Sequence, residues 1–229
     1  MTKAGKLVSI TVFCVVEFAL LITLLFGGGE LARIASFASI ALAFAFSLLF
    51  LSIKHKKIIT QLALLFTVCA DVCLVLARPQ NQSLGMSFFS IVQILYFVRL
   101  LLETPNKQIR LANLISRCVA IVAVVVTTLC VLGTKADYLS LISMFYFTNL
   151  VLNVVFAFIN IKTNPLLAIG LLLFMFCDVI IGLQCAIGVY IDIPSTSFLY
   201  QLAFSSFNWA WLFYLPSQAI LSISSINQK

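Results

Sequence analysis

The chain has 229 residues, of which 63% are hydrophobic and 9% are charged. An average soluble domain is roughly 45–50% apolar and about 25% charged, so this much apolar surface cannot be hidden in one water-soluble core. The net charge of +7 comes from short basic clusters between apolar segments, which is typical of membrane topology rather than of a nucleic-acid-binding face. The composition therefore excludes a soluble globule and indicates an all-α, polytopic membrane protein with no nucleic-acid partner.

Eight apolar segments alternate with short polar or glycine-containing breaks, and each is long enough to cross a ~30 Å hydrocarbon layer as a helix. The predicted spans are Leu7–Phe26, Leu31–Ile53, Ile58–Ala77, Leu84–Glu103, Ile109–Leu132, Tyr138–Ile161, Pro165–Ile187 and Ser197–Ser225. Met1–Lys6 imitates the basic start of a secretory signal, but the following run contains Glu17 and lacks a cleavage site of small residues. We therefore expect residues 1–229 to form a single transmembrane domain, an eight-helix bundle.

The basic residues of the loops predict the orientation of the bundle. With an even number of spans both termini lie on one side, which then collects nine basic residues: Lys3, Lys6, Lys54, Lys56, Lys57, Lys107, Arg110, Lys162 and Lys229. The other side has three: Arg33, Arg78 and Lys135. Because lysine and arginine accumulate in cytoplasmic loops, both termini are predicted to be cytoplasmic. The expected location is the plasma membrane of a bacterium.

The cysteines and the single histidine give little sign of a metal site. All seven cysteines lie in apolar segments, and His55 lies in a basic loop, so no zinc-ligand spacing and no disulfide framework is expected. Cys69 and Cys73 share a helix face beside Asp71, which leaves a metal site as an alternative. Buried cysteine is also an ordinary small hydrophobic residue. We expect neither a metal nor an organic cofactor.

Charged residues inside the spans are costly in hydrocarbon and usually face a bundle interior or a wet cavity. They are Glu17, Asp71, Arg99, Arg117 and Asp178. The two arginines are expected to reach toward the cytoplasmic surface, and Arg99 has Glu103 one helical turn away as a partner. Asp71 and Asp178 each lie thirteen residues after the start of their spans (58 to 71 and 165 to 178), about 20 Å along the helix. The two aspartates are therefore expected at the same depth.

The segments around the two aspartates resemble each other. Residues 68–74 (VCADVCL) are echoed by residues 175–181 (MFCDVII), and a polar connection then leads to Ser-Phe at 87–88 and at 197–198. This pattern predicts two parallel four-span repeats, residues 1–105 and 106–229. The repeat would place the two carboxyls around one cavity, within about 10 Å. Glu17, Gln93 and Asn208 are expected in the same layer, where interhelical hydrogen bonding is the alternative explanation for the amides.

Several motifs resemble those of the YhhN-like lysoplasmalogenases, a family of about this length with eight spans. The motifs are Cys69-Ala70-Asp71, Gly85 with Gln93 and Tyr96, Phe174–Asp178 with Gly182-Leu183-Gln184, and Tyr214–Gln218 running into Leu221–Ser224. The family has Gly-Asp in the third span, Gly, His and Tyr in the fourth, Ser-Asp with a later Asn in the seventh, and Tyr and Gln in the eighth. Here Ala70, Gln93, Cys177 and Gln184 replace Gly, His, Ser and Asn. These departures indicate a divergent branch, and Gln93 cannot titrate as histidine does.

The resemblance implies hydrolysis of the vinyl ether bond of a lysoplasmalogen, which gives a fatty aldehyde and glycerophospho-ethanolamine or -choline. The residues suit this reaction independently, because an acid must protonate the vinyl carbon before water captures the oxocarbenium ion. Two neighbouring carboxyls in a low dielectric cannot both ionise. Asp71 and Asp178 are therefore the predicted catalytic pair, one as the acid and the other as the group that stabilises the cation and orients water.

Eight further residues are predicted to bind the lysophospholipid substrate. They are Glu17, Arg78, Gln93, Tyr96, Gln184, Asn208, Tyr214 and Gln218. Arg78 lies seven residues after Asp71, hence on nearly the same helix face and about 10 Å nearer the non-cytoplasmic surface. Its forked donors suit a lipid phosphate. The alternative is that Arg78 only ends the third span at the interface.

Two other functions stay open at this point. Intramembrane carboxylates at a repeat interface also serve proton-coupled transporters and flippases. The third and seventh spans have no glycine or proline break of the kind that alternating access favours. A purely structural or scaffold role is the other interpretation. The expected partners are the lysophospholipid and the bilayer, and the sequence does not predict an oligomeric state.

Overall fold

The computed structural model describes residues 2–50 and 55–226, and helices dominate these ranges. The α-helices are α1 (Lys3–Gly27), α2 (Gly29–Leu48), α3 (His55–Asp71), α4 (Gln82–Glu103), α5 (Lys107–Leu132), α6 (Tyr138–Ile159), α7 (Pro165–Ala186), α8 (Phe198–Phe204) and α9 (Trp209–Ile226). A π-helical turn, Val72–Leu76, follows α3, and a short 3-10 turn, Gly133–Lys135, follows α5. Ile53, where the second span was predicted to end, and Lys54 and Lys229 lie outside the described residues. The all-α prediction is confirmed.

Polar residues set the starts of six of the described helices, and four of these residues lie in the predicted breaks. Their side chains accept a backbone N–H from the first turn, which satisfies one of the unpaired donors there. These residues are Thr2, Asn81, Asn106, Asp137, Asn164 and Ser197. The breaks read from the sequence are therefore real helix boundaries.

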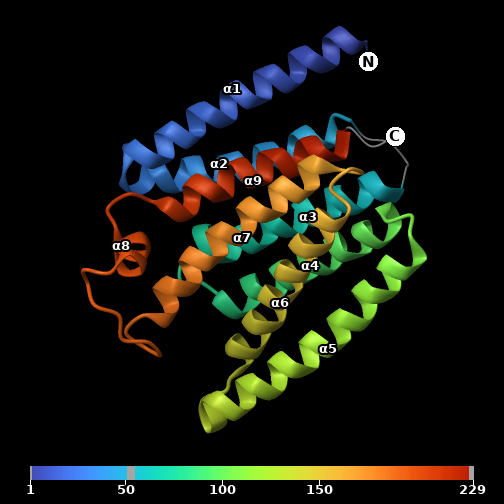
Figure 1. The fold of residues 1–229 in the computed structure, drawn as a ribbon. Coiled ribbons are helices and arrows are strands. Elements are labelled where there is room, and N and C mark those ends of the chain that lie inside the picture. The colour runs from blue at the N-terminus through green and yellow to red at the C-terminus, as the bar shows by residue number, and fades with distance from the viewer. Residues whose placement is uncertain (1, 51–54, 227–229) are drawn as a thin grey trace.

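The predicted eighth span, Ser197–Ser225, is wrong as one helix. The chain forms α8, leaves the helical conformation at residues 205–208, and starts again with α9. The Asn208 side chain accepts a hydrogen bond from the Trp211 N–H at 3.4 Å, and the Ser205 hydroxyl donates to the Phe207 carbonyl at 2.8 Å. These local bonds compete with the helix, as short polar side chains commonly do. Figure 1 shows α8 at the end of the bundle, apart from α9.

Seven of the described helices are long and apolar enough to cross a membrane. They are α1, α2, residues 58–76 of α3 with its π turn, α4, α5, α6 and α7. The remaining long helix, α9, has 18 residues and contains Pro216 and Gln218. The helices fit a multi-pass membrane protein, and the eight-span bundle stays a prediction.

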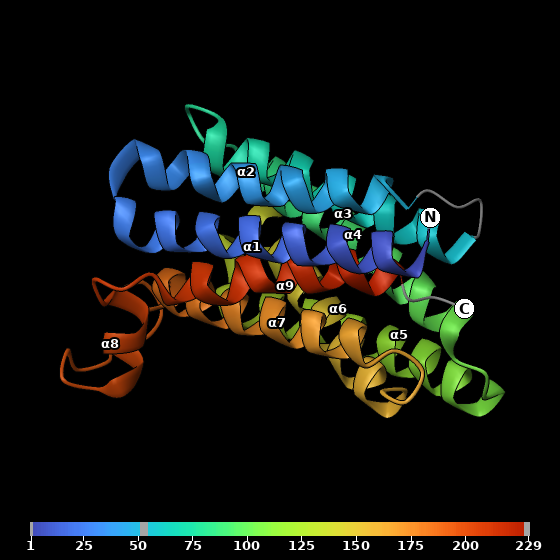
Figure 2. The ribbon, with the colours of Figure 1, turned by 90° about the horizontal axis from the view of Figure 1, so that it is seen from above.

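Five helices form a ring around the core. α3 contacts α4, α4 contacts α6, α6 contacts α7, α7 contacts α9, and α9 contacts α3. α2 packs on α3 and α9, α1 packs on α2 and α9, and α5 packs on α6. Figures 1 and 2 show the long helices running between the two ends of the bundle, with the N- and C-termini at the same end. There the Lys6 ammonium donates to the Ile226 carbonyl at 3.4 Å.

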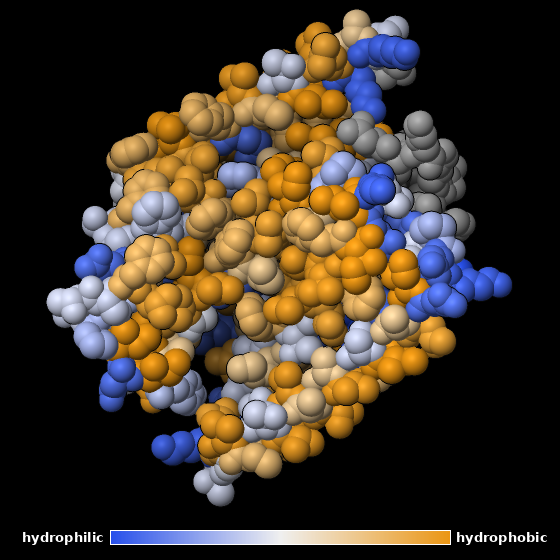
Figure 3. Space-filling model, viewed as in Figure 1, coloured by the Kyte–Doolittle hydropathy of each residue, from blue (hydrophilic) through white to orange (hydrophobic). Residues whose placement is uncertain are grey.

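The outer surface of the bundle is largely apolar. Figure 3 shows hydrophobic side chains across the middle of one face and hydrophilic side chains gathered toward its ends. Many large apolar side chains on the outer helices are exposed, among them Val12 and Val15 of α1 and Val119 and Val122 of α5. So wide an apolar surface suits lipid rather than water. The division into repeats 1–105 and 106–229 stays a prediction.

Two glycines allow close packing inside this arrangement. A Cβ atom on Gly85 would lie 2.5 Å from Leu74 Cγ, and one on Gly170 would lie 2.7 Å from Leu221 Cγ. Distances this short require the leucine side chain or its helix to move. Gly85 thus lets α4 approach the π turn, and Gly170 lets α7 approach α9.

Candidate functional site

The two aspartates predicted from sequence are brought together inside the ring. Asp71 ends α3 and Asp178 lies in α7, and the two carboxyls interact electrostatically. The Tyr214 hydroxyl donates to Asp71 Oδ2 at 2.8 Å, and the Tyr146 hydroxyl donates to Asp178 Oδ2. Asp71 is 3% exposed, whereas Asp178 is partly exposed. Four helices therefore build one cluster of two carboxyls, each held by its own phenol.

Aromatic rings surround this cluster. Phe89 of α4 and Phe174 of α7 each contact both tyrosines, with ring centroids between 5.5 and 6.5 Å apart. Phe89 and Phe174 also contact each other at 5.7 Å in an edge arrangement. Such rings fix the tyrosines by packing and keep the surroundings apolar. Tyr214 is predicted from the sequence but Tyr146 is not, because it lies in an apolar helix with no charged residue near it in sequence.

The chain changes its helical winding directly after Asp71. The Ala77 N–H donates to the Val72 carbonyl at 2.8 Å, five residues back, which marks a π turn. π turns are rare, and they are found frequently at functional sites. The sequence has no glycine or proline within residues 72–76 that would have indicated this turn.

The π turn overturns the placement predicted for Arg78. Its helix ends at Leu76 and Ala77 is extended, so Arg78 does not continue the helix face of Asp71. Arg78 is exposed and interacts electrostatically with Glu30, which is paired with Arg33. Helical spacing does not place Arg78, because the chain does not keep 3.6 residues per turn after Asp71.

A second polar layer lies inside the ring, farther along the bundle axis than the aspartates. Gln93, Tyr96 and Gln218, all predicted from sequence, are each 0% exposed. Asn153 Nδ2 donates to the backbone oxygen of Gln93 at 2.9 Å and to its Oε1 at 3.0 Å. Gln93 Nε2, the Tyr96 hydroxyl and Gln218 Oε1 have no hydrogen-bond partner among the described residues. The ring thus brings together several buried hydrogen-bonding groups near the aspartates.

The expectation that Arg99 reaches the surface is wrong. Its side chain is 0% exposed, and its Nε donates to Glu103 Oε1 at 2.9 Å. Its Nη1 donates to Thr60 at 2.8 Å and to Ser224 at 2.9 Å. Because partners from three helices satisfy the guanidinium, it does not need water.

The same expectation is wrong for Arg117, which is 5% exposed. Its amino groups donate to Asn113, Asn149 and Asn153, and its guanidinium carbon lies 4.1 Å from the centre of the Phe97 ring. Amide oxygens and a ring face thus replace water around its amino groups, whereas its Nε has no hydrogen-bond partner among the described residues.

Three of the predicted substrate-binding residues lie away from the aspartates. Glu17 of α1 is buried and accepts a hydrogen bond from Ser39 of α2. Gln184 is exposed and donates to the Ala203 carbonyl at 2.8 Å, which ties α7 to α8. Asn208 is exposed and caps α9 rather than lying in the aspartate layer. It lies at the start of α9 because the predicted eighth span is interrupted before it.

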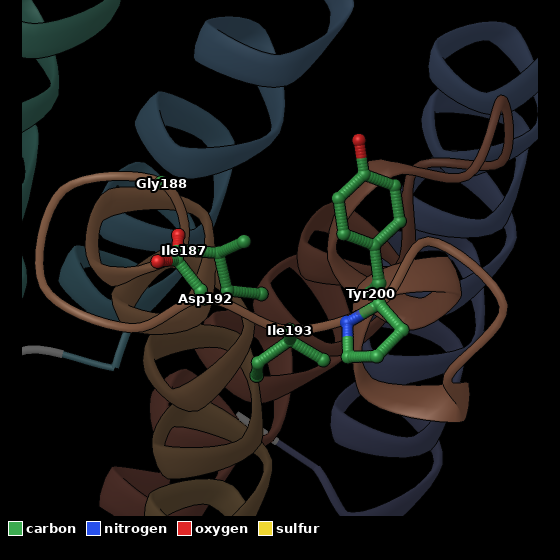
Figure 4. Close-up of a pocket in the computed structure, with 6 residues that line it drawn as sticks. Ile187, Gly188, Asp192, Ile193 and Tyr200 are labelled. Atoms are coloured by element: carbon green, nitrogen blue, oxygen red, sulfur yellow. The ribbon is translucent and has the colours of Figure 1, made fainter.

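A surface hollow of about 440 Å³ lies in the connection between α7 and α8. Figure 4 shows Asp192 and Tyr200 among the residues that line it. Neither residue belongs to the predicted site. Among the described residues no group of three or more His, Cys, Asp or Glu side chains gathers in a way that could hold a metal ion.

Comparison with known proteins agrees with the motifs. Searches of curated proteins and of solved structures find no match to the chain. Residues 31–224 match the YhhN family. This range contains both aspartates, both tyrosines, Gln93 and Gln218, so the match covers the whole candidate site. The resemblance inferred from the motifs is confirmed, and the chain belongs to the YhhN family.

Proposed function

We propose that this protein is an intramembrane hydrolase that cleaves the vinyl ether bond of a lysoplasmalogen. The observation that carries the proposal is the pair Asp71 and Asp178 inside the ring, each with its own tyrosine donor. Membership of the YhhN family is compatible with this activity. The products are a fatty aldehyde and a glycerophospho head group.

The two carboxyls divide the chemistry between them. One aspartate donates a proton to the β-carbon of the vinyl ether, and the oxocarbenium ion that forms is stabilised by the other, ionised aspartate. Water adds to the cationic carbon and gives up a proton to a carboxylate. The hemiacetal then collapses, so that the C–O bond breaks, the aldehyde leaves and the glycerol oxygen regains a proton. Each tyrosine hydroxyl donates a hydrogen bond to Oδ2 of its aspartate, which leaves Oδ1 for substrate and water.

The surroundings suit a single-chain ether lipid. The buried rings of Phe89 and Phe174 keep the surroundings of the two carboxyls apolar. Asp178 is more exposed than Asp71, so we place the approach of the lipid on the side of Asp178. Arg78 stays our candidate for the lipid phosphate, now as an exposed loop residue rather than as part of the helix face of Asp71.

We further propose that the chain crosses the membrane eight times, with α9 as the last crossing and both termini in the cytoplasm. The termini lie at the same end of the bundle in Figures 1 and 2, as an even number of crossings requires. Lys3, Lys6, Lys107, Arg110 and Lys162 belong to that end, and basic loops favour the cytoplasm. A bacterial plasma membrane is the proposed location.

The test is a direct assay of the purified full chain. Incubation with a defined lysoplasmalogen should release the fatty aldehyde, whereas the saturated-ether analogue should stay intact because it cannot form the oxocarbenium ion by protonation. Absence of aldehyde from folded protein would refute the proposal.

The alternative is a proton-coupled lipid or small-molecule transporter that uses the same aspartates. Buried polar groups follow one another inside the ring, from Asp71 to Gln218 and Arg99. This observation supports a transporter, because such groups also line proton pathways. Reconstituted vesicles distinguish the two functions, since a transporter moves intact lipid or protons across the membrane without producing aldehyde.

A further inference from the structure

Two buried glutamines leave complementary atoms unpaired. Gln93 on α4 and Gln218 on α9 are both 0% exposed. In the described part of the chain neither Gln93 Nε2 nor Gln218 Oε1 has a hydrogen-bond partner. Buried polar atoms are nearly always paired, because an unpaired one is costly in apolar surroundings. A donor and an acceptor left open in one bundle therefore require a physical explanation.

The two glutamines belong to the same layer. Figure 1 shows α4 and α9 running in the same direction. The rings of Phe89 and Tyr214 lie 6.5 Å apart, and Arg99 donates to Ser224 at 2.9 Å. Each pair is 125 residues apart in sequence (89 to 214 and 99 to 224), and so are the glutamines (93 to 218). The helices thus keep one register, and both glutamines lie about 6 Å from the aromatic contact, toward the same end of the bundle.

The neighbouring residues fix which atom of Gln93 is open, and a contact within α9 indicates which atom of Gln218 is open. Arg117 can only donate, so the oxygen of the Asn153 amide turns toward it, at 2.9 Å from Nη2. The Asn153 amino group is then left to donate to Gln93 Oε1 at 3.0 Å, and Gln93 Nε2 is the free end. Gln218 donates through Nε2 to Ser217 at 3.4 Å, which leaves its oxygen free. The site therefore offers one donor and one acceptor.

We infer that Gln93 and Gln218 bind a hydroxyl group beside the aspartate pair. A hydroxyl accepts from Gln93 Nε2 and donates to Gln218 Oε1 at the same time. An ionised phosphate or carboxylate has no proton for Gln218, and an ammonium group cannot accept from Gln93. The unpaired hydroxyl of Tyr96, three residues beyond Gln93, adds a buried group that can donate or accept.

The inference rests on the proposed hydrolase, which supplies two candidate hydroxyls. One is the free hydroxyl on the glycerol of the lysolipid, and the other is the water that hydrolysis consumes. In the first case the glutamines select a substrate with a free glycerol hydroxyl. In the second they position the attacking water.

The experiment compares two probes on the purified full chain and on Gln218→Met, which removes the acceptor but keeps the length of the side chain. Dissociation constants are measured for a saturated-ether lysolipid and for its analogue without the glycerol hydroxyl, neither of which can be hydrolysed. The turnover number for lysoplasmalogen is measured in parallel. Binding does not depend on hydrolysis, so the two measurements separate this inference from the proposed function.

If the glutamines hold the lipid hydroxyl, the wild type binds the hydroxylated probe about 10-fold more tightly, and Gln218→Met removes this preference. If they hold water, the wild type binds both probes equally, and Gln218→Met lowers the turnover number about 10-fold without changing binding. The inference is overturned if the wild type prefers the hydroxylated probe and Gln218→Met keeps this preference. It is equally overturned if the wild type shows no preference and Gln218→Met has an unchanged turnover number.

Two further variants distinguish an effect on binding or turnover from a folding defect. Gln61 is also buried, but its Nε2 donates to the Ser47 carbonyl at 3.0 Å. Gln61→Met is the matched control and should lower thermal stability while leaving any preference between probes intact. If Gln218→Met does not fold, Gln93→Met removes the donor and carries the same expectations. If the wild type releases no aldehyde, the proposed function fails, and the binding preference alone decides the inference.

Discussion

Tyr214 and Asp71 are 143 residues apart in the chain, and the tyrosine hydroxyl lies 2.8 Å from Asp71 Oδ2. This contact joins α9 to the end of α3 inside the ring. Tyr146 and Asp178 make the same kind of contact between α6 and α7. The carboxyls are thus positioned by tertiary packing rather than by their local sequence, and this determines how each substitution should act.

Asp71→Asn and Asp178→Asn should each reduce the turnover number at least ~100-fold, the range expected when a general acid or base is lost. Asparagine keeps the shape of the side chain but neither donates the catalytic proton nor carries the compensating charge. Aldehyde release is measured at equal amounts of folded protein. Asp192→Asn, in an exposed loop, is the matched control and should behave as the wild type. Near-normal turnover in either variant would remove that aspartate from the mechanism.

Tyr146→Phe and Tyr214→Phe should lower turnover without abolishing it, because each carboxyl loses the donor that fixes its orientation. Stability should fall by about 1–3 kcal/mol in each case, the cost of leaving a buried acceptor unpaired. Thermal unfolding and aldehyde release are the measurements. Tyr138→Phe is the control, since the Tyr138 hydroxyl contacts Ser87 on the exposed surface at 2.9 Å. Equal effects from all three substitutions would argue against an orienting role.

Glu103→Ala should be among the most destabilising single substitutions, by about 3–5 kcal/mol, because it leaves the buried Arg99 cation without its carboxylate. The double variant Arg99→Met with Glu103→Met should recover most of the loss, since no unpaired charge then remains. Unfolding free energies of the two variants in one detergent test this. A double variant as unstable as Glu103→Ala would show that the pair is not coupled in this way.

Gly170→Ala should destabilise the contact between α7 and α9, by about 1–3 kcal/mol, because the new methyl group meets Leu221. Gly182 lies on the same helix with nothing within 4 Å of an added Cβ. Gly182→Ala should therefore stabilise the protein by roughly 0.5–1 kcal/mol through the better helix propensity of alanine. Opposite shifts of the melting temperature are expected, and shifts of the same sign would contradict the packing.

The cap at the start of α6 should weaken in acid. The Ser140 N–H and hydroxyl beside Asp137 lower the pKa of that carboxyl. The contribution of this carboxylate to stability is therefore present above the ordinary aspartate pKa and is lost as the pH falls through the lowered pKa. Hydrogen exchange of the first amides of α6, corrected for intrinsic rates, should accelerate in that range. Asp137→Asn still caps but does not titrate, so its exchange should lack this step.

Hydropathy and loop composition were enough to predict nearly all of the long helices, and the position of Asp71 and Asp178 within spans pointed to the cluster inside the ring. They failed where local hydrogen bonding interrupts an apolar segment, as at Asn208, and where the helix changes its winding, as after Asp71. They also missed Tyr146, because its role exists only once α6 lies beside α7. Sequence spacing gives the depth of a residue in a regular helix but not the partners that another helix brings.

The burial of the two arginines illustrates the same limit. Near the end of a span, a long cationic side chain is expected to reach water. Arg99 instead finds Glu103 and Ser224, and Arg117 finds three asparagines from two helices. The sequence contains all of these partners, but only the fold shows that they converge.

The first helix, α1, lies outside both the family match and the ring of helices. The part that matches the family begins at residue 31, after α1 has ended, and α1 lies outside the ring. Its one buried charged residue, Glu17, contacts Ser39 and so fastens this helix to α2. Evolution could therefore exchange the first helix for another apolar segment and keep every residue of the proposed chemistry, provided that the replacement still covered Ser39.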